Sequence, residues 1–154
     1  MKIIEGDLVK MAKSGRFQVI VHGCNCWHTM GAGVAKAIRQ EFPEAWAADL
    51  KTVKGAKEKL GTISVGEAER DGKQILVVNG YTQYHWRGNG EKVDYAAIRK
   101  VMALVKQKFT GMSIAYPKIG AGLGGGDWPK IEEIIGQELV NEDHTLVILP
   151  RNNI

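Results

Sequence analysis

Two glycine-rich segments of this chain have the composition of loops that hold an anion. One is Met30-Gly31-Ala32-Gly33, which lies between an apolar stretch and a segment with helical periodicity; the other is residues 120–126, with five glycines in seven positions. Glycine lets the backbone approach a ligand closely, and successive N–H groups at a turn or a helix N-terminus attract phosphate. We therefore predict that both loops cradle a diphosphate. Loops that only need several left-handed turns are the alternative.

Three side chains beside these loops could take part in chemistry. His22 ends an apolar stretch, and an imidazole titrates near neutral pH, so it is the first candidate for orienting a nucleophile. Asp127 follows the second loop and could accept a proton, while His28 could contact a terminal phosphate. The alternatives are a hydrogen-bonded core histidine, an aspartate that caps a helix, and a solvated loop histidine.

Spacing disfavours two other chemistries. A zinc site would have to use the alternating residues His22, Cys24, Cys26 and His28. On an extended strand these would span roughly 20 Å, too far for one tetrahedral ion, so we predict neither a metal nor a cofactor. A dinucleotide fingerprint is matched by Gly120, Gly122 and Gly125, but it lies late in the chain instead of in a first βαβ unit.

The elements that must position the loops alternate between short apolar and longer amphipathic segments. We predict strands over 2–5, 17–22, 62–68, 74–79, 112–116 and 145–149. We predict helices over 34–42, 43–53, 94–109 and 128–140. Arg70-Asp71-Gly72 is typical of a hairpin turn between the third and fourth strands. This order indicates an α/β fold around a parallel or mixed sheet, with ligands at the carboxyl ends of the strands.

Length and composition indicate one domain over residues 1–154, with a formal net charge of +4. That charge favours an anionic ligand and tolerates nucleic acid but requires neither. The two cysteines are one residue apart, which disfavours a disulfide. The chain shows neither a signal-peptide pattern nor a membrane-spanning apolar run, so we expect a cytoplasmic protein without a membrane partner. An aromatic cluster is formed by Tyr81, Tyr84, His85 and Trp86, and it could line the ligand cleft or stack a base. A basic stretch is formed by Lys51, Lys54, Lys57 and Lys59, for which a solvated helix face is the alternative. Together they leave nucleic-acid binding open.

The two loops, together with Glu5-Gly6-Asp7-Leu8, resemble the macrodomain family over nearly the whole chain. Within that family, residues 22–26 and 31–35 are similar to the yeast-type ADP-ribose-1″-phosphate phosphatases and the related ADP-ribosyl-ester hydrolases. The resemblance implies a three-layer α/β/α sandwich with a mixed central sheet. It also implies that the ligand is ADP-ribose or ADP-ribose 1″-phosphate.

The resemblance further implies roles for individual residues. Asp7 would accept a hydrogen bond from the adenine amino group, Leu8 would supply a backbone contact, and Asn25 would meet the distal ribose. For Asp7, a helix cap before Leu8 is the alternative. The diphosphate and distal ribose would be enclosed by Gly31, Ala32, Gly33, Val34, Gly120, Ala121, Gly122, Leu123, Gly124 and Gly125.

The chain departs from one branch of the family. Hydrolases of that branch that use a lysine and an aspartate would carry them near Gln83 and Gly124, and neither residue type is found there. Glutamine cannot form a Schiff base, so a covalent lysine route is disfavoured. We predict a metal-independent hydrolase that removes phosphate from ADP-ribose 1″-phosphate or cleaves a related ADP-ribose ester. The alternatives are a non-catalytic ADP-ribose reader and a hydrolase that acts on ADP-ribosylated protein or nucleic-acid ends.

Overall fold

The computed structural model describes residues 1–88 and 90–150 and contains one six-stranded sheet in the order β1-β6-β5-β2-β4-β3. The strands are β1 (Lys2–Glu5), β2 (Val19–Cys24), β3 (Ile63–Arg70), β4 (Lys73–Tyr81), β5 (Ser113–Tyr116) and β6 (Asp143–Ile148). Neighbouring strands are parallel except for β3 and β4, which form an antiparallel hairpin. The predicted mixed sheet is therefore confirmed.

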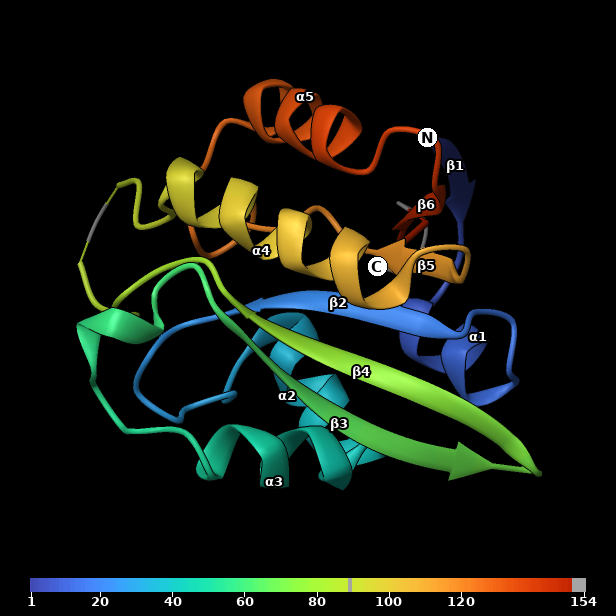
Figure 1. Cartoon of the computed structure of the whole chain (residues 1–154). Coiled ribbons are helices and arrows are strands. Elements are labelled where there is room, and N and C mark those ends of the chain that lie inside the picture. The colour runs from blue at the N-terminus through green and yellow to red at the C-terminus, as the bar shows by residue number, and fades with distance from the viewer. Residues whose placement is uncertain (89, 151–154) are drawn as a thin grey trace.

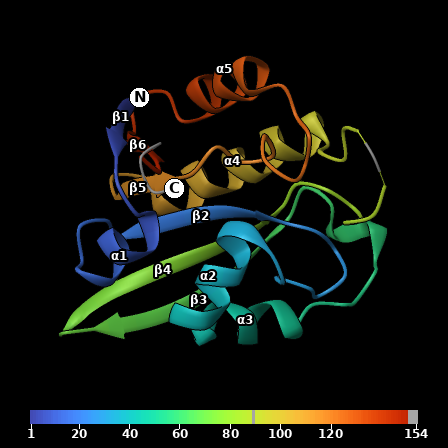
Figure 2. The same cartoon turned by 180° about the vertical axis from the view of Figure 1, so that it is seen from behind.

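Helices cover both faces of the sheet, as Figures 1 and 2 show. They are α1 (Leu8–Lys13), α2 (Gly33–Glu41), α3 (Pro43–Leu50), α4 (Tyr95–Phe109) and α5 (Trp128–Glu138), with a short 3-10 turn at Lys57–Lys59. The first three lie on one face, and α4 and α5 lie on the other (Figure 1). This arrangement confirms the predicted three-layer α/β/α sandwich. No helix within the described part of the chain is long and apolar enough to cross a bilayer.

The central strand β2 shows why its sequence is almost entirely apolar. Val19 and Val21 pack into the core beneath α4 and α5, whereas Ile20 packs into the core beneath α1, α2 and α3. Successive side chains of a strand point to opposite faces, so a strand covered on both sides needs apolar residues at every position. The first glycine-rich loop therefore follows a strand that is buried on both faces.

The β3–β4 hairpin turns at the predicted Asp71-Gly72 pair. Both residues have positive φ, 53° and 78°, as a two-residue type I′ turn requires. The register Arg70↔Lys73 closes the hairpin directly around this pair. β3 continues past its predicted end to Arg70, and β4 exceeds its predicted limits at both ends, because the antiparallel ladder runs from Ile63↔Gly80 to Arg70↔Lys73.

Several predicted boundaries were wrong by a few residues. β2 runs to Cys24 instead of His22, because Gly23 and Cys24 continue the parallel ladder with β4. α3 ends at Leu50, where the Thr52 hydroxyl donates to the Asp49 carbonyl. α5 ends at Glu138, and β6 starts two residues early because Asp143 pairs with Ser113. Ladder ends depend on long-range partners, which local composition does not report.

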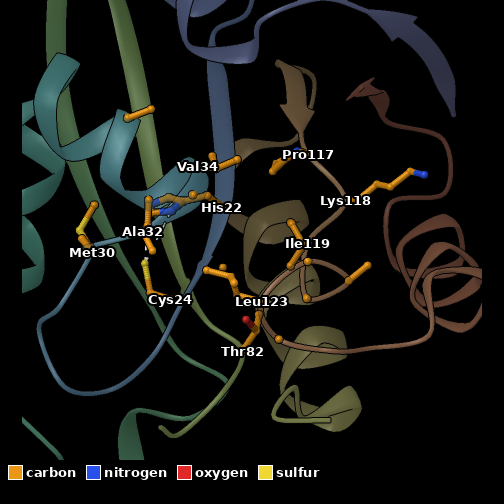
Figure 3. Close-up of a pocket in the computed structure, with 18 of the residues that line it drawn as sticks. His22, Cys24, Met30, Ala32, Val34, Thr82, Pro117, Lys118, Ile119 and Leu123 are labelled. Carbon is orange, nitrogen blue, oxygen red and sulfur yellow. Dashed lines mark hydrogen bonds between the residues drawn. The ribbon is translucent and has the colours of Figure 1, made fainter. Parts of the chain in front are cut away.

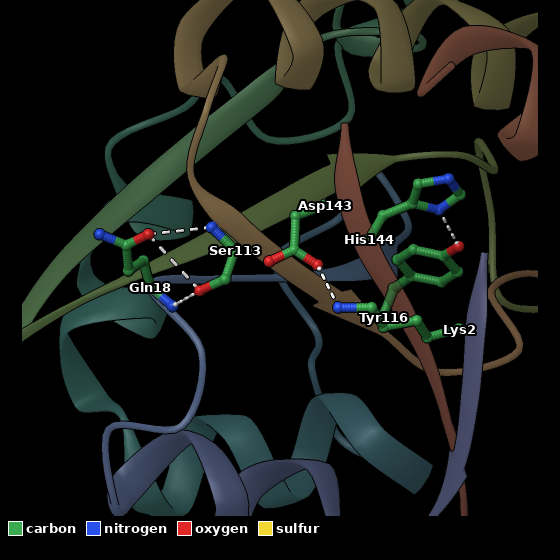
Figure 4. Close-up of polar contacts among 6 residues, drawn as sticks. All are labelled: Lys2, Gln18, Ser113, Tyr116, Asp143 and His144. Carbon is green, nitrogen blue, oxygen red and sulfur yellow. Dashed lines mark hydrogen bonds and ion pairs between the residues drawn. The ribbon is translucent and has the colours of Figure 1, made fainter. Parts of the chain in front are cut away.

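Polar contacts tie together the amino-terminal ends of the strands (Figure 4). Gln18 Oε1 accepts from the Ser113 amide at 2.9 Å, and Lys2 Nζ lies 3.2 Å from Asp143 Oδ1. Nearby, the buried Tyr116 hydroxyl lies 2.6 Å from His144 Nδ1. The Gln18–Ser113 and Lys2–Asp143 contacts connect β1, β2, β5 and β6 at this edge of the sheet, while the loops gather at the opposite edge, where Tyr116 ends β5.

Candidate functional site

A cavity of about 940 Å³ lies at the carboxyl ends of the strands. It is lined by residues that end or follow five strands: Asp7, Cys24, Thr82, Pro117 and Ile148. Open α/β sheets bind ligands at this edge, and the volume is within the usual range for a small-molecule site. Figure 3 shows residues from both glycine-rich loops around the same space.

The first loop connects β2 to α2 and is organised by Asn25. The Asn25 Oδ1 atom accepts from the Trp27 amide at 2.8 Å, and Nδ2 donates to Thr29 Oγ1 at 2.6 Å. The helix begins at Gly33 with φ of 58°, and Ala32 at the N-cap offers no side chain to its amides. Within the described ranges, the amides of residues 31 and 32 donate to no protein acceptor. These exposed donors suit an anion.

The second loop is folded on itself by backbone hydrogen bonds. The Gly126 amide donates to the Gly120 carbonyl at 2.8 Å, and the Gly125 amide donates to the Gly122 carbonyl at 3.0 Å. Gly120 has φ of 76°, a value that side chains disfavour. The amides of residues 122–124 find no acceptor among the described residues. Leu123 is 69% exposed and lines the cavity, so it can cover a bound group.

His22 lies at the floor of the cavity and is only 1% exposed. Its Nε2 atom is 2.7 Å from Asn79 Oδ1, while Asn79 Nδ2 donates to Ala45 and Ser64. Because the amide oxygen must accept, His22 Nε2 donates, and Nδ1 keeps its lone pair. Burial lowers the pKa of His22 to about 4, so the ring is neutral at pH 7. His22 therefore makes a hydrogen bond in the core and also lines the cavity.

A second buried polar group, Asp49 on α3, also lines the cavity. Its Oδ1 atom accepts from the Tyr81 hydroxyl at 2.7 Å, whereas Oδ2 has no partner in the described ranges. Lys59 is buried nearby and donates to the Cys26 carbonyl at 3.1 Å. Burial lowers the pKa of the Lys59 ammonium. A solvated helix face, the alternative for the lysine stretch, is therefore not what the structure shows at Lys59, which is buried at the end of the 3-10 turn.

The structure brings most of the predicted ligand residues together around one cavity. Those that line it are Asp7, Leu8, His22, Asn25, Gly31, Ala32, Gly33, Val34, Gly120, Ala121, Gly122, Leu123 and Gly124. Asp7 also caps α1, since its Oδ1 atom accepts from the Lys10 amide at 3.1 Å. The cap alternative for Asp7 is thus confirmed without removing the residue from the cavity.

Three predicted residues do not line the cavity: His28, Gly125 and Asp127. His28 instead lies 2.9 Å from the Thr52 hydroxyl, and Gly125 holds the internal turn of its loop. Asp127 is exposed at the N-cap of α5, although its side chain makes no capping hydrogen bond. Both loops turn back on themselves, and sequence order did not reveal which of their members face inward.

One end of the cavity is formed by Thr82, Gln83, Trp86 and Lys92. Trp86 was expected as a possible cleft residue, whereas the other three were not predicted as site residues. Lys92 is brought there by a β-bridge between Gln83 and Val93, a pairing without a local sequence signal. The predicted aromatic cluster needs a correction in membership. Tyr81 is buried in the core, and Trp27 replaces it, with ring centroids 5.8 Å from Tyr84 and 6.4 Å from Trp86.

The cysteines and histidines weighed as zinc ligands have different partners. Cys24 Sγ lies 3.6 Å from His22 Nε2 and 3.8 Å from Nδ1, and burial raises the pKa of this thiol. Cys26 instead donates to the Gln83 carbonyl. Over residues 1–88 and 90–150, no three histidine, cysteine or acidic side chains are grouped so that they could hold a metal ion.

Comparisons with known proteins link this geometry to a family. A family model described as Macro domain matches residues 21–135. The 17.5 kDa protein of the tk-vs intergenic region of Enterobacteria phage T4 is 38% identical over 88% of this chain and 87% of its own length. The ADP-ribose 1″-phosphate phosphatase of Candida albicans is 26% identical, covering 92% of this chain and 94% of the relative.

Other similar proteins are longer than this chain. The DNA ADP-ribosyl glycohydrolase of Thermus aquaticus is 26% identical over 90% of this chain, which spans only 38% of that relative. The structure of Thermosipho africanus DarTG in complex with ADP-ribose has a TM-score of 0.74 and 20% identity. It covers all of this chain, which spans 43% of that structure. At this identity, the structural similarity concerns the fold.

Proposed function

Because the chain belongs to the macro domain family, we propose that its cavity binds ADP-ribose and that the protein hydrolyses ADP-ribose 1″-phosphate. The observation that carries this proposal is the pair of loops whose unpaired amides border one cavity. Among the described residues, amides 31–32 and 122–124 lack protein acceptors, as expected of a diphosphate cradle. The name of the Candida albicans relative supports the choice of ester.

The ligand would lie across the sheet edge in one direction. Asp7 and Leu8 would hold the adenine at the β1 end, with the diphosphate between the loops. A carboxylate has lone pairs enough to cap α1 and accept from the adenine amino group. The distal ribose would then lie near Asn25 and the carboxyl end of β4.

The proposed reaction removes a phosphate monoester. Water attacks phosphorus, the bond from phosphorus to the C1″ oxygen breaks, and inorganic phosphate and ADP-ribose are released. The reaction needs an oriented water and stabilisation of the phosphoryl oxygens. The unpaired amides would supply the stabilisation, and His22 Nδ1 would accept a hydrogen bond that orients the water. Asp127, the other predicted catalytic residue, lies outside the cavity lining, so the proposed reaction assigns it no step.

A second function, removal of ADP-ribose from nucleic-acid ends, is favoured by one observation. Trp86 lines the β4 end of the cavity and stacks on His85, with centroids 4.1 Å apart and an interplanar angle of 13°. Arg87 lies 5.1 Å from the Trp86 ring. An aromatic and cationic surface at that end suits an attached base. The Thermus aquaticus relative is named a DNA ADP-ribosyl glycohydrolase.

Calorimetric titration with ADP-ribose, with AMP and NAD as controls, tests the proposed ligand. We expect ADP-ribose to bind at least tenfold more tightly than either control. AMP is too small to fill the proposed site, and NAD carries an additional base at the distal ribose. Phosphate release from ADP-ribose 1″-phosphate and loss of ADP-ribose from a modified oligonucleotide then separate the two activities. Binding without either turnover would indicate a reader module. Absence of ADP-ribose binding would overturn the proposal.

A further inference from the structure

Lys92 is a cationic residue at the end of the cavity opposite Asp7. From its position and charge we infer that Lys92 recognises an anionic group on the distal sugar, so that the site selects ADP-ribose with a terminal phosphate over ADP-ribose itself. This inference rests on the proposed function, because it assumes that the adenine lies at Asp7. It assigns a specificity-determining role to a residue outside both glycine-rich loops.

The first argument is the place of Lys92 in the fold. The cavity extends from residues that follow β1 to Thr82 and Gln83, which follow β4. The bridge between Gln83 and Val93 brings Lys92 to that β4 end. A ligand with its adenine at the opposite end and its diphosphate between the loops would direct its distal substituent toward Lys92.

The second argument is charge. Lys92 and Lys118 are the two cationic residues in the described cavity lining. Figure 3 shows Lys118 extending away from the space between His22 and Leu123. The acidic residues of the lining are Asp7, at the far end, and Asp49, which is buried under the first loop. Lys92 is therefore suited to attract a group that carries negative charge beyond the diphosphate.

The third argument is preorganisation. The Lys92 Nζ atom donates to the Leu123 carbonyl at 2.8 Å, and the Lys92 amide donates to the Gly124 carbonyl at 2.7 Å. An ammonium has three donors, so two remain for a ligand after the bond to Leu123. A long side chain normally loses rotamer entropy when it binds an ion. Here the bond to the second loop already restrains the side chain at the cavity.

Rapid-mixing tryptophan fluorescence, read before turnover, tests the inference, because Trp86 lines the same end of the cavity. The two probes are ADP-ribose and ADP-ribose 1″-phosphate. For Lys92→Met we expect affinity for the phosphorylated probe to fall at least about tenfold, the effect of one charge-assisted hydrogen bond. Affinity for ADP-ribose should change by less than about threefold. Lys92→Arg should retain most of the preference for the phosphorylated probe.

Lys36→Met is the matched control. Lys36 is exposed on α2 near the first loop but does not line the cavity, so its removal changes net charge without changing the contact. Equal affinities of Lys36→Met and the wild type would show that long-range charge does not explain the effect. If the wild type binds both probes and Lys92→Met weakens both equally or neither, the inference is wrong. If the wild type binds neither probe, the proposed function fails first.

Discussion

Asn79 determines what His22 can contribute at the floor of the cavity. The Asn79 Oδ1 atom accepts a hydrogen bond from His22 Nε2, so Nδ1 is the nitrogen with a lone pair for a ligand, a water molecule or the Cys24 thiol 3.8 Å away. Burial lowers the pKa of His22 to about 4, which makes the ring a weak base at neutral pH. Its proposed role is therefore to orient a water molecule with a neutral lone pair.

Replacement of His22 tests this role directly. We expect His22→Ala to lower the rate of phosphate release by about a hundredfold, since a positioned proton acceptor typically contributes that much or more. ADP-ribose affinity should stay within about threefold, because the loops that hold the diphosphate are intact. Steady-state kinetics and calorimetry on the same protein separate the two effects.

Asp127→Asn and His28→Ala are the comparisons for this test. Neither side chain lines the cavity, so both variants should keep activity within about threefold of the wild type. Circular dichroism must show that His22→Ala is folded, because the change removes a buried hydrogen bond. Undiminished phosphate release by a folded His22→Ala protein would remove His22 from the mechanism. A large loss with Asp127→Asn would instead return Asp127 to it.

Among the helices, strands and turns, those that depend on interactions between near neighbours in the chain were predicted from local sequence patterns. In the segment predicted as a helix over 94–109, apolar residues recur every four positions at Ala97, Val101, Val105 and Phe109, and all four are buried in α4. The Asp71-Gly72 turn could also be predicted from the sequence, because its backbone requires positive φ at both positions and Asp-Gly is a preferred pair for such a turn. The β4 end of the cavity was not readable, since Lys92 reaches it through a bridge formed after the chain has folded back.

The second loop leaves little space for a side chain at Gly124. An added Cβ would lie 2.8 Å from the Gly120 carbonyl oxygen and 3.0 Å from Gln83 Oε1. The backbone oxygen cannot move without shifting the loop, so we expect Gly124→Ala to weaken ADP-ribose binding at least tenfold by calorimetry. Unchanged affinity would mean that this loop does not contact the ligand.

Gly136→Ala provides a control on another element for the Gly124 test. Gly136 is exposed within α5, and an added Cβ there meets nothing within 4 Å. Alanine in a helix interior should raise the free energy of unfolding by about 0.5–1 kcal/mol. ADP-ribose affinity should be unchanged, so any loss in Gly124→Ala can be assigned to the loop and not to glycine replacement in general.

For the whole molecule, the order of elements along the chain predicted the position of the site better than the net charge did. A mixed sheet places the carboxyl ends of parallel strands at one edge, and both loops predicted from glycine content are found there. The formal charge of +4 permitted nucleic acid without identifying a surface for it. The burial of Lys59 and of Asp49, which lines the cavity, was not predicted, because the sequence around a charged residue gives no sign that it is buried.

The same burial that makes His22 neutral should make the stability of the molecule depend on pH. In the unfolded chain His22 has its ordinary pKa of 6.5, and in the folded protein the pKa is about 4. Between these values the unfolded state binds more protons, so stability is full above pH 6.5 and is lost as pH falls toward 4. The pKa of His144 is also lowered by burial and acts in the same direction.

Urea unfolding of the wild type and His22→Gln at pH 7 and pH 5 isolates the contribution of His22. The linkage relation gives a loss of about 2 kcal/mol in the wild type over this interval that the glutamine variant should not show. Effects of His144 and of the acidic residues are common to both proteins and cancel in the difference. Parallel pH profiles would mean that His22 can be protonated in the folded state, and the neutral-imidazole role would then have to be abandoned.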